Sequence, residues 1–195
     1  KGDSDSINKS AKAMARTVVE EDVALMRRVA TGEDAAMALL VDRWKGPLLR
    51  FFNRSLQSHA DAEELAQTTF LKIYRAAERY QPIAKFSTYL FTVARRILLD
   101  EHKRRARHPV DSTDPVNLRT KVEPEGKLRS FELEEALQQC LRKLPEKQRT
   151  SLLLRVQREL SYKEIASIMK ASQGAVKTWI HRARNHLREN LKQLL

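Results

Sequence analysis

Apolar residues recur every three or four positions along most of this chain, a period that predicts α-helices. The first predicted helix starts at Val18 and stops at Thr31–Gly32. The second covers 33–56, and Gly46–Pro47 predicts a kink or restart inside it because proline removes a helical hydrogen bond. Long helices therefore dominate this part of the chain.

A third helix is predicted to begin at Asp61, whose side chain would cap it, with Glu64 completing a capping box. Its apolar face, spaced by four and three residues, consists of Ala62, Ala66, Phe70, Ile73 and Ala77. Gln81–Pro82 ends this helix. A fourth is expected to start near Ser87 or Thr88 and to continue into the basic cluster at 103–107.

The character of the chain changes at residues 108–126, which contain three prolines, few apolar residues and no periodicity. Such a stretch is typical of a linker. The helical pattern resumes near Lys127 and holds to Leu195, with breaks at Pro145 and around Leu160 and Ala171. The predicted fold class is all-α, with a disordered tail (1–16), a helical domain (17–107), a flexible linker (108–126) and a second helical domain (127–195).

The clearest motif lies in the second domain. Ser161 and Glu164 are spaced as a capping box for one short helix, and Ser172 is placed to cap another after a turn of about three residues. The second of these helices carries one apolar row, made by Val176, Ile180, Ala183 and Leu187. This is the pattern of a helix-turn-helix, in which the second helix enters the DNA major groove.

The opposite side of that helix carries the candidate base and phosphate contacts. We expect Lys177 to donate to guanine acceptors and Arg182, with Arg184 or Arg188, to grip phosphate. The full predicted DNA-binding set on this helix is Gln173, Lys177, Thr178, His181, Arg182 and Arg184.

Charge supports a nucleic-acid partner. The chain of 195 residues has a formal net charge of +12. From Pro145 to Leu195 there are 11 Lys or Arg against 4 Glu, so the surplus gathers around the helix-turn-helix. A pair of amphipathic helices that merely packs would show the same apolar row, and it remains the alternative to a DNA-reading helix.

Several functional classes have no support in the residues. Cys140 is the only cysteine, which excludes an intrachain disulfide and a Cys-based zinc site and suggests a small buried apolar residue. The five histidines show no metal-ligand spacing, and no nucleophile constellation or phosphate-cradling glycine loop is present. No apolar stretch is long enough to span a membrane. We therefore expect a cytoplasmic, nucleoid-associated protein that is not an enzyme and has no cofactor or metal.

Three stretches together resemble one family. The run Asp61-Ala62-Glu63-Glu64-Leu65-Ala66-Gln67 and the run Phe86-Ser87-Thr88-Tyr89-Leu90-Phe91 are similar to two parts of region 2 of extracytoplasmic-function bacterial sigma factors. The run Ser161-Tyr162-Lys163-Glu164-Ile165-Ala166, with Gly174-Ala175-Val176-Lys177, resembles region 4 of that family. The similarity spans about 18–191 in the order and spacing of the family.

The resemblance assigns a polymerase-binding face to the third helix. In the family this face contacts the clamp helices of the largest catalytic subunit of core RNA polymerase, and the C-terminal domain rests on the polymerase flap. The corresponding residues here are Asp61, Glu64, Gln67, Leu71 and Arg75. An exposed leucine among charges is consistent with a protein contact. The alternative is a solvated face with one stray leucine.

The resemblance also assigns the fourth helix to the −10 promoter element and the C-terminal helix-turn-helix to the −35 element. An aromatic ring followed by cations along one face suits single-stranded DNA, because rings stack on bases and cations follow phosphates. The predicted −10 residues are Phe86, Tyr89, Thr92, Arg96, Lys103 and Arg107. The preceding loop, 80–86, would hold a flipped-out base. Many relatives have Asn where this chain has Arg96, so base identity cannot be carried over.

The function that follows is promoter recognition together with nucleation of promoter melting by a non-catalytic initiation factor. Its expected partners are core RNA polymerase, promoter DNA and an anti-sigma factor. The competing hypothesis is an ordinary helix-turn-helix regulator that acts without binding polymerase. It gives no function to the helix face around Gln67.

Overall fold

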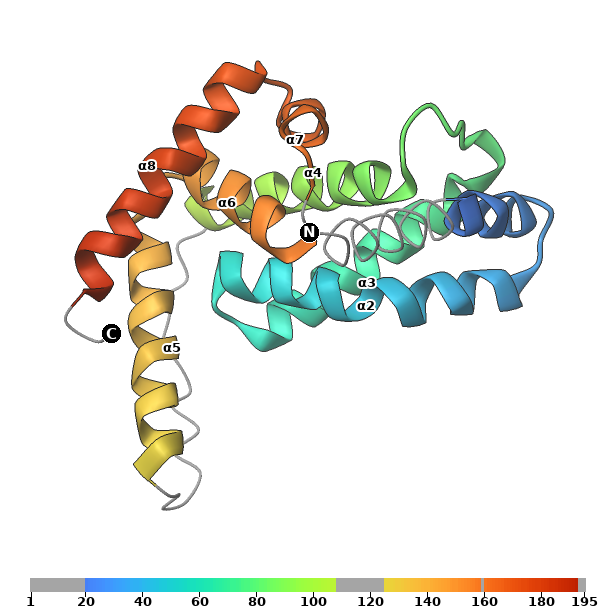
Figure 1. Cartoon of the computed structure of the whole chain (residues 1–195). Coiled ribbons are helices and arrows are strands. Elements are labelled where there is room, and N and C mark those ends of the chain that lie inside the picture. The colour runs from blue at the N-terminus through green and yellow to red at the C-terminus, as the bar shows by residue number, and fades with distance from the viewer. Residues whose placement is uncertain (1–19, 108–124, 159, 193–195) are drawn as a thin grey trace, which may run out of the picture.

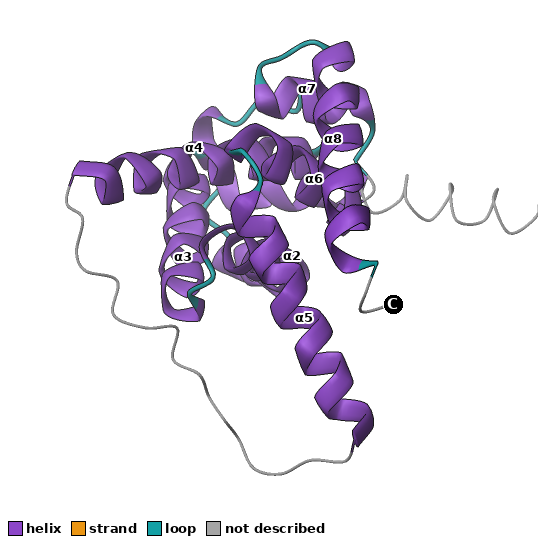
Figure 2. Ribbon diagram, turned by 90° about the vertical axis from the view of Figure 1, so that its left-hand side faces the viewer, coloured by secondary structure: helices purple, strands orange, loops and turns teal. Residues whose placement is uncertain are grey.

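The computed structural model describes residues 20–107, 125–158 and 160–192, and every regular element in these ranges is helical (Figures 1 and 2). The predicted tail and most of the predicted linker lie outside the described residues. The elements are a helix over 20–30, α2 (Asp34–Leu56), α3 (His59–Arg75), η1 (Ala77–Arg79), α4 (Phe86–Arg107), α5 (Glu125–Lys143), α6 (Glu146–Arg158), α7 (Tyr162–Met169) and α8 (Gln173–Leu191).

The predicted breaks at 31–32, 145, 160 and 171 are confirmed, but three local predictions are wrong. The third predicted helix was expected to end at Gln81–Pro82, whereas α3 ends at Arg75 and the short 3-10 helix η1 follows it. Helix α2 continues through Pro47, so the predicted restart is wrong; Pro47 is buried with Trp44 and Leu48, and this packing offsets the missing hydrogen bond. Helix α3 is capped by Ser58 rather than by Asp61: the Ser58 hydroxyl accepts from the Asp61 backbone N–H at 3.3 Å. The side chain of Asp61 is thereby left to pair elsewhere.

The apolar faces of the N-terminal half are buried as the periodicity predicts. All five residues predicted for the apolar face of the third helix are at most 8% exposed, four of them in α3 and Ala77 in η1. In α4, Leu90, Ala94 and Ile97 are buried, and Val93 packs against the same core. Full burial of one such side chain contributes about 1.5–3 kcal/mol, so these rows determine which sides of α3 and α4 face solvent.

The C-terminal half consists of α5 to α8. Helix α7 carries the predicted capping box between Ser161 and Glu164, and the hydroxyl of Ser172 accepts from the Ala175 backbone N–H at 3.2 Å. The turn between α7 and α8 starts with Lys170 in the left-handed region, at φ 51°. Cys140 is buried and free, as expected for a small apolar residue.

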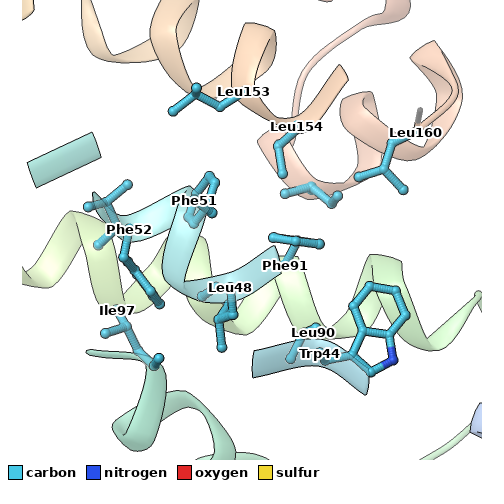
Figure 3. Close-up of a cluster of buried hydrophobic side chains, with 14 of the residues drawn as sticks. Trp44, Leu48, Phe51, Phe52, Leu90, Phe91, Ile97, Leu153, Leu154 and Leu160 are labelled. Carbon is cyan, nitrogen blue, oxygen red and sulfur yellow. The ribbon is translucent and has the colours of Figure 1, made fainter. Parts of the chain in front are cut away.

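The two halves pack on each other, which the sequence did not predict. Helix α6 contacts α2, and α7 contacts α4. Figure 3 shows Leu153, Leu154 and Leu160 of the C-terminal half on one side of the contact. Phe51 and Phe91 of the N-terminal half lie on the other side. All five side chains are at most 4% exposed and belong to one hydrophobic cluster. The chain therefore forms a single body in this structure.

Polar groups also meet across this interface. Lys85 Nζ lies 2.9 Å from Glu164 Oε1, and Arg95 Nη2 lies 3.8 Å from Glu146 Oε1. His102 of α4 is half-buried here. Burial and then the charge of Arg149 lower the pKa of His102, while Glu146 opposes the shift. Within α4 itself, Arg105 also lowers this pKa and Glu101 raises it.

Acidification should therefore destabilise the packed state through His102. The neutral imidazole is favoured in the folded chain, so its contribution is complete above the unfolded-state pKa of about 6.5 and is lost as the pH falls below it. We expect the melting temperature to fall between about pH 7.5 and about pH 5.5, one above and one below that pKa. The fall should be larger in the wild type than in His102→Gln.

The matched control is His181→Gln, since His181 is exposed on α8. This variant should keep the pH dependence of the wild type. Circular dichroism melts at both pH values measure the effect, and identical pH dependence in His102→Gln and the wild type would contradict it.

Candidate nucleic-acid and polymerase interfaces

The helix-turn-helix presents one side of α8 to solvent. Val176, Ile180 and Ala183 are buried against the rest of the domain. All six predicted −35 residues are exposed, namely Gln173, Lys177, Thr178, His181, Arg182 and Arg184. The periodicity of the apolar row thus identified the outward side of this helix correctly, and all six residues carry groups that can donate or accept hydrogen bonds near base edges or phosphates.

Two of these side chains make contacts that restrict them. Lys177 Nζ lies 5.7 Å from the centre of the Tyr162 ring, so the lysine leans toward α7. The Thr178 hydroxyl donates to the Gly174 carbonyl at 3.0 Å, which leaves its methyl group and lone pairs for a partner. Both residues lie in the first two turns of α8, the part of a recognition helix that reaches base edges.

A shallow hollow at the start of α8 brings further cations to this surface. It is lined by Lys163 and Lys170 from the first helix and its C-terminal cap, and by Ser172 and Gln173. Neither lysine was among the predicted site residues, because neither lies on the second helix where the apolar row defines an outward face. Their charge suits a phosphate of DNA that lies across the motif.

Helix α4 carries the predicted −10 residues along a partly exposed stripe. Arg96, Lys103 and Arg107 are exposed, whereas Tyr89 and Thr92 are half-buried. The Thr92 hydroxyl donates to the Thr88 carbonyl at 2.6 Å. Burial raises the pKa of Tyr89, with a smaller opposite effect from the nearby charge of Arg96. The neutral phenol and the cation therefore lie near each other at the same end of the stripe.

Phe86 does not lie on that stripe. Its side chain is 1% exposed, and its ring centre lies 6.0 Å from Trp44, 6.4 Å from Tyr80 and 6.3 Å from Tyr89. A direct contact between Phe86 and DNA is inconsistent with this placement, because the first turn of α4 turns the ring into the aromatic cluster. Phe86 instead supports Tyr80 and Tyr89, whose rings are 5.1 Å apart.

The loop before α4 shows two features that sequence reasoning did not single out. Ile83 is 87% exposed, although it is a large apolar side chain. The aromatic cluster behind the loop is anchored by Asp22, which accepts from the Trp44 indole N–H at 3.1 Å. Burial raises the pKa of Asp22, and hydrogen bonding to Arg43 opposes this rise.

The outward side of α3 combines charge with exposed apolar surface. Glu64, Gln67, Leu71 and Arg75 are all exposed, and Leu71 is 47% exposed. Asp61 differs from them. It is partly buried and pairs with Arg105 of α4 at 2.5 Å, so it holds the two helices together.

Exposed apolar side chains missed by the sequence analysis extend this surface. Tyr74 follows Leu71 on α3, is 44% exposed, and donates a hydrogen bond to Asp34 at the start of α2 at 2.9 Å. Leu39 of α2 is 50% exposed. Their exposure could not be read from the sequence, because it depends on how α2 and α3 pack. Exposed apolar groups among charges are typical of protein-binding surfaces.

Within the described ranges, no group of three or more His, Cys, Asp or Glu residues is arranged to hold a metal ion. No helix in these ranges has both the length and the apolar character of a membrane span.

Comparison with known proteins covers both halves of the chain. Residues 40–108 match the Sigma-70 region 2 family, and residues 134–187 match the family described as Sigma-70, region 4. The ECF RNA polymerase sigma factor SigW of Bacillus subtilis is 32% identical over 179 residues, which cover 87% of this chain and 96% of SigW. The ECF RNA polymerase sigma-E factor of Escherichia coli K12 is 30% identical over 184 residues, covering 89% and 96% of the two chains.

Two solved structures have similar folds. CnrH, in complex with the cytosolic domain of CnrY, aligns with a TM-score of 0.67 at 22% identity and covers 89% of this chain and 98% of CnrH. The sigma factor RpoE of Bartonella quintana, in complex with the anti-sigma factor NepR, aligns with a TM-score of 0.65 at 25% identity and covers 80% and 96%.

These similarities extend over the N-terminal half as well as the helix-turn-helix, which a stand-alone helix-turn-helix regulator would not explain. The chain therefore belongs to the ECF family of RNA polymerase sigma factors, the non-catalytic initiation factors that recognise promoters.

Proposed function

We propose that the two halves divide promoter recognition between them. The half with α3 and α4 binds core polymerase through Glu64, Gln67, Leu71 and Arg75 and engages the −10 element through α4. The half with α8 reads the −35 element and rests on the polymerase flap. The proposed domains cover 17–107 and 127–195, and the factor works in the cytoplasm at the nucleoid.

The observation that carries this proposal is the exposure of three distinct surfaces on one short chain. The outward side of α8 has the cations and hydroxyls of a groove-reading helix, and α4 has a tyrosine beside cations. The side of α3 around Leu71 is charged and apolar, and a DNA-only function would leave it without a role.

An anti-sigma factor is a further proposed partner. RpoE of Bartonella quintana, which is 25% identical to this chain, was solved with the anti-sigma factor NepR. A regulator of this kind would act on the same surfaces that polymerase or DNA requires.

Run-off transcription tests the function directly. Core polymerase supplied with this protein should produce transcripts from a subset of a random promoter library, and neither component alone should do so. Tight, sequence-specific binding of duplex DNA by the free protein, with no transcripts in the presence of core polymerase, would contradict the proposal.

Substitution of the α3 surface should weaken polymerase binding without unfolding the chain. Leu71→Asp places a charge in the centre of the proposed contact, and Gln67→Ala removes a polar neighbour. Because residues at the centre of an interface typically cost about 1–4 kcal/mol on truncation, we expect a clear loss of affinity for core polymerase in titrations.

Lys72→Ala is the matched control, since Lys72 is exposed on the same helix about 100° away from Leu71. Unfolding curves of all three variants should match that of the wild type. Wild-type affinity in both Leu71→Asp and Gln67→Ala would show that polymerase does not bind here.

The exposed stripe on α4 should contribute to strand opening rather than to formation of the closed promoter complex. Tyr89→Ala removes a ring that would stack on a melted base, which is worth about 1–3 kcal/mol, and Arg96→Ala removes a phosphate contact. Both variants should retain the closed promoter complex but lose strand opening. Permanganate reactivity of thymines at −10 measures strand opening. Wild-type reactivity in both variants would contradict a role of α4 in holding the melted strand.

Substitution of Lys177 and substitution of Arg182 should change DNA binding in different ways. Lys177→Ala should cost about 1–3 kcal/mol and relax preference at one or two −35 positions, because its side chain lies where a recognition helix meets base edges. Arg182→Ala should weaken binding to all sequences alike and reduce the slope of affinity against salt by about one.

Titrations at several salt concentrations, on the best promoter and on single-base variants, separate these effects. Altered base preference in Arg182→Ala together with a uniform loss in Lys177→Ala would mean that α8 is rotated in the groove and that the two roles must be exchanged.

A further inference from the structure

Tyr162 is the first residue of α7, the first helix of the helix-turn-helix, and its half-buried ring packs against the hydrophobic core. Helix α7 contacts α8 and lies beside the N-terminal end of α8 (Figure 1). Two cations lie over the Tyr162 ring, one from α6 and one from α8. The ring is therefore the point at which side chains of all three helices meet.

The cation from α6 is Arg155, whose guanidinium carbon lies 5.2 Å from the ring centre. Its Nη1 donates a hydrogen bond to the Leu160 carbonyl at 2.8 Å, and Leu160 is 4% exposed. The backbone next to the ring is fixed as well, because Ser161 and Glu164 form the capping box of α7. The ring of Tyr162 is thus held in place by its neighbours before any partner binds.

The cation from α8 is Lys177, whose Nζ lies 5.7 Å from the same ring centre. An ammonium within about 6 Å of the centre is attracted by the negative face of an aromatic ring. Lys177 is exposed, and no carboxylate among the described residues forms an ion pair with it. The Tyr162 ring is therefore the group that orients this ammonium in the structure.

The place of Lys177 on α8 makes this orientation important. Lys177 follows the buried Val176 by one residue, which puts it about 100° around the helix from the core. Thr178 follows at about 200° and points away from the core. Lys177 consequently lies on the flank of α8 next to α7, and its side chain has to reach around this flank to meet a base edge.

Flexibility is the cost of using a lysine for this purpose. Its side chain is a flexible stem of four carbons with a compact charge at the end. Immobilising such a side chain on binding costs conformational freedom and reduces affinity. A ring that already holds the ammonium on one flank reduces this cost for the base pairs that the ammonium reaches from there, and for no others. Preorganisation of this kind therefore affects the choice of base.

We propose that Tyr162 is a positioning residue for base readout at the −35 element, because its ring holds the ammonium of Lys177 in the direction from which it meets a guanine acceptor. Arg155 fixes the ring from the α6 side. Tyr162 acts through Lys177 rather than through a DNA contact of its own. This inference rests on the proposed function, which assigns Lys177 to base edges.

A second stack of the same kind on α8 provides a matched control. Lys147 Nζ of α6 lies 5.6 Å from the centre of the Trp179 ring. Trp179 follows Val176 by three residues, so it lies about 300° around the helix, on the flank away from Lys177. This stack holds none of the residues predicted to read bases. Its loss in Lys147→Ala should therefore leave base preference unchanged.

Nuclear magnetic resonance of the free full-length chain tests the contact itself. A nuclear Overhauser effect should connect the Tyr162 ring protons with the methylene protons at Cε of Lys177. Tyr162→Phe keeps the ring and should keep the effect, and Lys177→Ala assigns the lysine signal by its loss. Absence of the effect in the wild type would overturn the proposal.

Base preference at −35 tests the consequence, with the full-length protein and core polymerase on the best promoter and its single-base variants. Tyr162→Leu should reduce preference at the one or two positions that Lys177→Ala relaxes. The expected reduction is about two- to five-fold, the size of one exposed cation–π contact. Tyr162→Phe and Lys147→Ala should both retain the preference of the wild type.

The double variant distinguishes positioning from independent effects. Tyr162→Leu combined with Lys177→Ala should show the base preference of Lys177→Ala alone, because the ring then has no lysine to position. Additive losses of preference would refute this role. An equal loss in Tyr162→Phe and Tyr162→Leu would refute it too, since the hydroxyl would then be the group that matters. A loss in Tyr162→Leu that is uniform over all sequences would show a structural role only.

The same measurements separate this inference from the proposed function. If Lys177→Ala leaves base preference at −35 unchanged, the proposed role of α8 is contradicted, and the role of Tyr162 with it. If Lys177→Ala relaxes base preference but Tyr162→Leu does not, the role of Tyr162 alone is contradicted and the proposed function stands.

Discussion

Burial of the apolar rows on α3, α4 and α8 is the constraint on which the rest of this molecule depends. Each helix has one side committed to the core, so the opposite side is committed to solvent and to partners. Ile73, Leu90 and Ile180 are at most 1% exposed. Their burial leaves Leu71, Arg96 and Lys177 exposed on the opposite sides of the three helices.

This constraint explains why so much of the fold was predictable. Capping signals and apolar periodicity are local, and they located α7, α8 and most of the breaks between helices correctly. Ser161 and Glu164 form the predicted capping box because both partners lie within one turn. One error was local as well: Ser58 and Asp61 both carry side chains that can cap a helix, and Ser58 is the residue at the N-cap of α3.

Tertiary contacts between helices far apart in the sequence were not predictable in this way. Phe86 was expected at the DNA, but the rings of Trp44 and Tyr80 enclose it. The exposure of Tyr74 and the packing of Leu154 against the N-terminal half likewise depend on relative helix positions. Periodicity identifies the buried side of a helix but not the helix that covers it.

Each helix has a buried side and an exposed side, and the proposed function assigns the exposed sides of α4 and α8 to different DNA elements. Photo-cross-linking in the initiation complex tests this most directly, with a cross-linker at Thr92 of α4 or at Thr178 of α8. The account predicts that Thr92 cross-links near −10 and Thr178 near −35 of the same promoter. Cross-links from both positions to one segment of DNA, or none from Thr92, would contradict it.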